Sequence, residues 1–116
     1  MSILSNLFSR KEDTSNLDSA SFEKLIHDDK NAIVLDVRTE HENSEERIPK
    51  SVLIDIYKPN FLNKIEELDK TKTYLVYCHS GSRSYAAFKK MKQLGFESVY
   101  NLKSGIIGWN GRVEQG

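Results

Sequence analysis

One apolar run, from Thr73 to Tyr77, ends at Cys78, which is the only cysteine of this 116-residue chain. A short polar loop with one glycine follows, and from Ser84 the apolar residues recur at helical spacing as far as Leu94. The segment therefore predicts a buried strand, a tight loop and a helix in succession. Such a loop directs backbone N–H groups and the positive end of the helix dipole toward the group that it holds, which here is a thiol.

The loop residues beside Cys78 form the candidate binding site: His79, Ser80, Gly81, Ser82, Arg83 and Ser84. Gly81 can adopt the positive φ that a curled loop needs, and Arg83 adds a fixed positive charge. Amide donors and a nearby cation lower the pKa of a thiol, so we predict a reactive thiolate at Cys78. The alternative is a small, inert core residue, which is the ordinary role of a lone cysteine. Serines, glycine and arginine are poor core residues, and their presence favours the thiolate.

The rest of the chain alternates between predicted strands and predicted helices. The expected strands lie at 32–35, 51–56, 73–77 and 98–102, and the polar stretch 39–50 separates the first two. The expected helices lie at 19–27, around 61–68 and from Ser84 onward, with a short helix or turn at 105–113. Asp18 is expected to cap the first helix, and Gly95 to end the helix that begins at Ser84. This alternation predicts an α/β fold, a small three-layer, open and mostly parallel sheet with helices on both faces. Asp36, Cys78 and Lys103 each follow a strand, so we expect them at one edge of that sheet.

The length allows one domain with one core, which we place at 15–116. Residues 1–14 are set apart as an N-terminal tail or a short amphipathic segment, because Ile3, Leu4, Leu7 and Phe8 form a short apolar stripe. The stripe is too short and too interrupted for a secretory signal or a membrane span, so we expect no stable membrane insertion. We expect a frayed tail or a segment packed on its own domain, and the alternative is a small amphipathic helix touching a membrane surface or a partner.

Charge and cysteine content exclude several classes of function. The formal net charge is zero and no basic stripe carries interleaved aromatic residues, so we expect no nucleic-acid partner. One cysteine excludes an internal disulfide framework, and no cysteines and histidines have the spacing of zinc ligands, so we expect neither metal nor cofactor. A free thiol that must stay reduced fits a cytoplasmic location. We expect a monomer.

Four segments resemble the rhodanese-like sulfurtransferases, over about residues 15 to 110. The string CHSGSRS at 78–84 is similar to the family's active-site loop C-R-S-G-x-R-S, and Asp36-Val37-Arg38 followed by Glu40 resembles its D-V-R-x-x-E segment. Residues 46–51 are similar to G-H-I-P-G-A, with Glu46, Arg47 and Lys50 in place of the glycines and the histidine. Residues 102–109 resemble the closing L-x-G-G-x-x-x-W, with Ser104 in place of its first glycine.

The resemblance implies the rhodanese fold and a sulfurtransferase activity. Cys78 would take a sulfur atom from a small anionic donor, either thiosulfate or a persulfide or polysulfide, and pass it from a cysteine persulfide to a thiol, cyanide or protein acceptor. Asp36 and Arg38 would brace the active-site loop, the alternative being an ordinary ion pair at the end of a strand. For Glu40 the residues leave two roles open: it holds Arg38 or Arg83 in place, or it is a solvated carboxylate. His79 stands where many members have arginine.

Two other functions remain open. Phosphatases and arsenate reductases with a nucleophilic cysteine use a similar loop, but the phosphatase loop has five residues between cysteine and arginine, whereas four separate Cys78 from Arg83. The shorter loop favours sulfur transfer. A non-catalytic rhodanese-like binding module is the other alternative, since a fold does not guarantee activity. Such modules often lack the cysteine that this chain retains.

Overall fold

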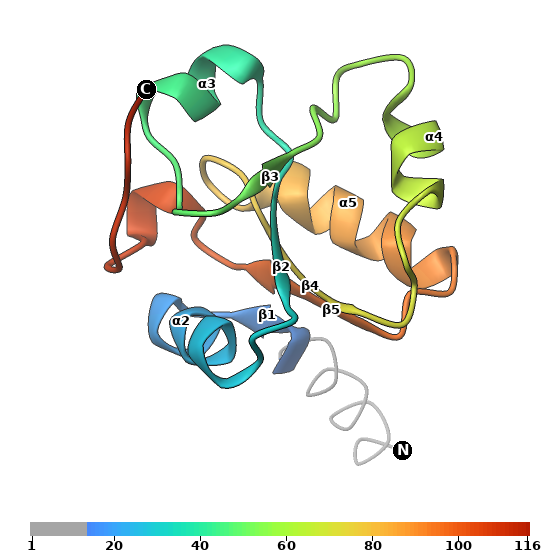
Figure 1. The fold of residues 1–116 in the computed structure, drawn as a ribbon, viewed down its shortest axis with the longest axis horizontal. Coiled ribbons are helices and arrows are strands. Elements are labelled where there is room, and N and C mark those ends of the chain that lie inside the picture. Colours follow the sequence, from blue (N-terminus) through green and yellow to red (C-terminus); the bar gives the residue numbers. More distant parts are fainter. Residues whose placement is uncertain (1–13) are drawn as a thin grey trace, which may run out of the picture.

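The computed structural model describes residues 14–116, and the prediction of a tail at 1–14 lies almost wholly outside the described residues. In the described part, one parallel sheet of five strands has the order β1-β5-β4-β2-β3. The strands are β1 (Asn16–Leu17), β2 (Ile33–Asp36), β3 (Val52–Leu53), β4 (Thr73–Tyr77) and β5 (Ser98–Leu102). The helices are α2 (Ser19–Asp28), α3 (Glu40–Glu45), α4 (Phe61–Glu66), α5 (Ser82–Gln93) and the 3-10 turn η1 (Ile106–Gly108). In Figure 1, α2 covers one face of the sheet and α4 and α5 cover the other, so the predicted three-layer α/β fold is confirmed.

The central strand β4 is buried from Tyr74 to Tyr77 because helices cover both of its faces. Tyr74 and Val76 pack in the cluster beneath α4 and α5, whereas Leu75 and Tyr77 pack with Phe22 of α2. Cys78 continues this alternation and joins the α5 side. The nucleophile candidate is thus attached directly to the most buried strand of the sheet.

The predicted ends of two helices are confirmed. Asp18 caps α2, because its carboxylate accepts a hydrogen bond of 2.8 Å from the amide of Ser21. After α5, Gly95 has a φ of 93°, and the amide of Phe96 donates to the carbonyl of Met91 at 3.1 Å. This is the Schellman arrangement, and it turns the buried ring of Phe96 back onto the core.

The structure differs from the prediction between β2 and α4. Helix α3 lies where no helix was predicted, and it begins with a capping box in which Thr39 and Glu42 exchange side-chain and backbone hydrogen bonds. Strand β3 is shorter than the predicted 51–56, because it is an edge strand that pairs with β2 over two residues. The two-residue strand β1 was also not predicted.

Candidate functional site

The loop after β4 leads directly into α5, which begins at Ser82 rather than at Ser84. Gly81 precedes the helix with a φ of 103°, and a Cβ atom there would collide with the carbonyl oxygen of Lys103. Gly105 has a φ of 67°, and a Cβ atom there would collide with the carbonyl of His79. The Cys78 loop and the loop after β5 therefore touch backbone to backbone, and only glycine fits at these two contacts.

Two further hydrogen bonds join these loops. The amide of Ile106 donates to the carbonyl of Cys78 at 2.9 Å, and the amide of Ile107 donates to the carbonyl of His79 at 3.2 Å. The position of the Cys78 loop is thus fixed by β4 on one side and by the loop after β5 on the other.

Three hydrogen bonds converge on the sulfur of Cys78. The amide of Gly81 donates at 3.2 Å, and the amide and the hydroxyl of Ser84 each donate at 3.3 Å. Both Cys78 and Ser84 are fully buried. The structure therefore places the sulfur among polar donors on one side and the apolar side chains beneath α5 on the other.

Two opposing effects set the pKa of the Cys78 thiol. Burial raises the pKa, because it disfavours the charged thiolate. The hydroxyl of Ser84, the amide of Ser84 and the amides of Gly81 and Ser80 stabilise the thiolate, and together they lower the pKa below its ordinary value. The arrangement can hold a sulfur anion.

Arg83 is bound by Glu42, not by Glu40. Its Nη1 and Nη2 donate to the two carboxylate oxygens of Glu42 at 2.9 Å each, and its guanidinium lies 5.5 Å from the ring centre of Tyr57. The prediction that Glu40 holds Arg83 or Arg38 is wrong, because Glu40 is the exposed first residue of α3 whereas Glu42 faces the loop. The bond with Arg83 is the main reason that the pKa of Glu42 falls to about 2.

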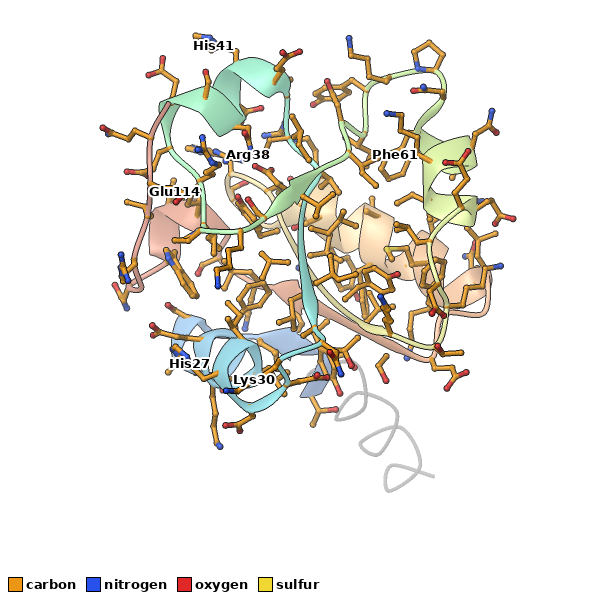
Figure 2. All side chains as sticks on the ribbon, viewed as in Figure 1. His27, Lys30, Arg38, His41, Phe61 and Glu114 are labelled. Carbon is orange, nitrogen blue, oxygen red and sulfur yellow. The ribbon has the colours of Figure 1, made fainter. Side chains whose placement is uncertain are left out.

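Asp36 and Arg38 form a buried pair that makes no hydrogen bond to the sulfur of Cys78. Arg38 donates through Nε and Nη2 to both carboxylate oxygens of Asp36, at 2.9 and 2.8 Å, and to the carbonyl of Glu46 at 2.7 Å. Asp36 also accepts hydrogen bonds from Tyr77 and from Asn43 of α3. Figure 2 shows Arg38 on the inner side of α3, from which His41 projects outward. The pair fixes α3 to the sheet, and α3 in turn carries Glu42 to Arg83.

The remaining loop side chains lie on the outer side. His79, Ser80 and Ser82 are exposed, and so is Lys103 at the end of β5. These side chains are in contact with solvent, whereas Cys78 and Ser84 lie beneath them.

Sequence reasoning missed two residues that contact the loop. Glu42 could have been found from Thr39-Glu40-His41-Glu42, since threonine followed three residues later by glutamate is typical of a capping box. The other is Asn101 of β5, whose side-chain amide donates to the carbonyl of Gly81 at 3.3 Å. Its signal is an asparagine inside a strand, where such residues are disfavoured.

One departure from the family pattern has a backbone consequence. Lys50 has a φ of 65° and is the one non-glycine residue of the described chain with a positive φ. It stands where the resembling segment has glycine. Nearby, Arg47 pairs with Glu114 through a side-chain bond of 3.2 Å and two backbone bonds.

Neither a metal cluster nor a membrane span is found between residues 14 and 116. No group of three or more histidine, cysteine, aspartate or glutamate side chains there could hold a metal ion. No helix in the same range is long and apolar enough to cross a membrane.

Comparison with known proteins gives matches over nearly the whole chain. The family model described as Rhodanese-like domain matches residues 18–112. A sulfurtransferase of Allochromatium vinosum is 30% identical over 95 residues, covering 82% of this chain and 87% of that protein. A tRNA uridine(34) hydroxylase of Cytophaga hutchinsonii is 38% identical over 109 residues, covering 91% of this chain but 34% of that protein.

Solved structures give the same result. The BH2092 protein from Bacillus halodurans has a TM-score of 0.79 at 29% identity, covering 99% of this chain and 87% of that one. A rhodanese-related protein from Thermoplasma volcanium has a TM-score of 0.76 at 30% identity, covering 87% and 98%.

Proposed function

Because the chain belongs to the rhodanese-like domain family, we propose that it is a sulfurtransferase whose nucleophile is the thiolate of Cys78. The observation that carries this proposal is the convergence of three donors, from Gly81 and Ser84, on one sulfur atom at 3.2–3.3 Å. A structural cysteine needs no such donors, whereas a thiolate does.

The reaction consists of two displacements. The thiolate attacks the outer sulfur of thiosulfate, a new S–S bond forms, and the old S–S bond breaks with its electron pair leaving on sulfite. The resulting persulfide ends in an anionic sulfur, which the donors that hold the thiolate can also stabilise. A nucleophilic acceptor then takes the outer sulfur, for example cyanide giving thiocyanate, and the Cys78 thiolate is restored. A persulfide or polysulfide donor reacts in the same way, with a thiolate or shorter polysulfide leaving.

No second cysteine exists in this chain to attack the persulfide and close an internal disulfide. The sulfur can therefore wait on Cys78 for an external acceptor, which is a small thiophile or a protein thiol. A persulfide of this kind survives best where thiols are kept reduced, and the cytosol is the expected compartment.

The other functions receive less support. The four residues between Cys78 and Arg83 leave the loop one residue shorter than a phosphatase loop, and the Arg83 guanidinium is already bound by Glu42. The likeness to tRNA uridine(34) hydroxylases supports no hydroxylase proposal, because this chain spans about a third of that relative.

Mass spectrometry of the intact protein after incubation with thiosulfate or glutathione persulfide tests the proposal. We expect one added sulfur atom on the wild-type protein and its loss after addition of cyanide. The Cys78→Ser variant should gain none. An unmodified wild-type protein with an intact fold would instead favour the non-catalytic binding module.

A further inference from the structure

The carbonyl of Gly81 has three hydrogen-bond donors around it. The amide of Tyr85 donates at 3.0 Å as the first bond of α5, the hydroxyl of Ser84 lies at 3.2 Å, and the side-chain amide of Asn101 lies at 3.3 Å. A carbonyl oxygen has two lone pairs. With the amide of Tyr85 committed to the helix, the Ser84 hydroxyl and the Asn101 amide compete for the other lone pair.

The hydroxyl of Ser84 has one proton and two acceptors within reach. One is the sulfur of Cys78 at 3.3 Å, and the other is the carbonyl of Gly81 at 3.2 Å. An O–H···O bond has an ordinary length of about 2.7–2.8 Å, so the contact with the carbonyl is long. Sulfur is a larger atom than oxygen, and 3.3 Å is a good length for a bond to it. The proton can stabilise the sulfur anion only when the Gly81 carbonyl does not take it.

The orientation of the Asn101 amide is fixed by its two neighbours. Its Nδ2 faces the carbonyl of Gly81 and the side-chain oxygen of Asn16, at 3.3 and 2.9 Å, and both of these are acceptors. Its Oδ1 is, among residues 14–116, the one buried side-chain polar atom without a hydrogen-bond partner. The side chain is 1% exposed, so water does not satisfy this oxygen from bulk solvent.

Asn101 is therefore a poor choice for stability alone. An unpaired buried carbonyl costs free energy, and asparagine is disfavoured in strands, where a leucine or valine would pack without either penalty. What Asn101 provides that an apolar residue cannot are two N–H hydrogen bonds, one to the side chain of Asn16 in β1 and one to the carbonyl of Gly81, and only the second reaches the Cys78 loop.

We propose that Asn101 is a positioning residue: by occupying the carbonyl of Gly81, its amide leaves the hydroxyl proton of Ser84 free to bind the sulfur of Cys78. The inference rests on the proposed function in taking Cys78 as the nucleophile. Asn101 itself lies outside the loop and acts through Gly81 and Ser84.

The pH profile of Cys78 alkylation by iodoacetamide tests this role, and the chain's single thiol makes that readout unambiguous. Asn101→Leu should shift the profile to higher pH and lower the alkylation rate on the rising part of the profile by about threefold or more, since below the pKa a rise of half a unit leaves roughly a third of the thiolate. Ser84→Ala should shift the profile at least as far. In the Ser84→Ala background, Asn101→Leu should add no further shift.

A matched control separates this role from general packing. Asn16→Ala removes the other acceptor of the Asn101 amide. The amide should still donate to Gly81, because the flipped orientation would bring two carbonyl oxygens together, so the profile of this variant should remain that of the wild type. Asn101→Val, a residue that suits strands, replaces Asn101→Leu if circular dichroism shows that the leucine variant does not fold.

Two outcomes would overturn the proposal: a wild-type profile for the Asn101 variant that folds, or the same shift with and without the Ser84 hydroxyl. Alkylation needs no sulfur donor. If the wild-type protein takes up sulfur but the Asn101 variant keeps the wild-type alkylation profile, this inference alone is refuted. If the profile of the Asn101 variant shifts but the wild-type protein takes up no sulfur, the proposed function alone is refuted.

Discussion

The guanidinium of Arg83 and the carboxylate of Glu42 form a bidentate ion pair that joins α5 to α3, and both N···O distances are 2.9 Å. The guanidinium lies at the start of α5, and the carboxylate of Glu42 balances its positive charge. Each side chain is about one quarter exposed, at 21% for Arg83 and 28% for Glu42. The contribution of this ion pair to the free energy of unfolding should be moderate and should depend on pH.

Glu42→Gln should lower the free energy of unfolding at neutral pH by about 1 kcal/mol. Glutamine can still complete the capping box with Thr39, so the change removes mainly the ion pair. The folded pKa of Glu42, about 2, lies below its ordinary 4.5, so the stabilisation is present above pH 4.5 and is lost as the pH falls toward 2. Urea unfolding at several pH values measures this. Glu40→Gln is the matched control and should change stability little; a constant difference at all pH values would contradict the assignment.

Lys50→Gly should raise the free energy of unfolding by roughly 0.5–1 kcal/mol. A left-handed backbone is unfavourable for lysine and open to glycine, and this gain exceeds the entropy that glycine loses on folding. Thermal unfolding of the two proteins checks the prediction. Lys30→Gly, at an exposed turn residue without a positive φ, should be destabilising instead. Destabilisation by both changes would show that the conformation of Lys50 is not strained.

Gly81→Ala and Gly95→Ala should separate two costs of an added Cβ atom: the strain of a positive φ and the collision with neighbouring backbone. Both glycines have a positive φ, of 103° and 93°, but a Cβ atom at Gly95 meets nothing within 4 Å. Gly95→Ala should therefore cost about 1 kcal/mol and leave the alkylation rate of Cys78 unchanged. Gly81→Ala should cost about 3 kcal/mol or more and slow alkylation, because the amide donor moves away from the sulfur. Equal effects of the two substitutions on alkylation would count against the role of the Gly81 amide.

His79→Arg should raise kcat/KM for thiosulfate. His79 is exposed beside Cys78, and arginine would place a permanent positive charge and a rigid fork of N–H donors at that position. One added charge near a dianion is worth about 1 kcal/mol, or roughly fivefold. Steady-state assays with thiosulfate measure the ratio of kcat/KM between the two proteins. His27→Arg, on α2, should have no effect; equal kcat/KM values for His79→Arg and the wild type would refute the prediction.

The fold could be predicted from sequence where burial fixes the pattern. Strands β4 and β5 have the predicted bounds, because both lie inside the sheet with a neighbouring strand on each side, and four of the five residues of β4 form one apolar run. Helix α3 was missed because it buries no residue and has no apolar stripe, so only its capping signal marks it. Without this helix, the sequence gives no reason to prefer Glu42 over Glu40 as the partner of Arg83. The helix shows that Glu42 is the one that faces Arg83.

The candidate site could be predicted as a loop but not as a network. Cys78, Gly81 and Ser84 are contiguous, and a strand–loop–helix turn brings contiguous residues together. Asn101 is separated from Gly81 by 20 residues, and its contact depends on β5 lying next to β4. Local patterns do not give that register.

The backbone junction between the Cys78 loop and the turn at η1 also provides a spectroscopic signal. The amides of Ile106 and Ile107 are hydrogen-bonded to the carbonyls of Cys78 and His79, so their exchange with deuterium is slow only while the two segments stay joined. Nuclear magnetic resonance can therefore follow the opening or tightening of the loop from two probes that belong to neither the nucleophile nor its donors.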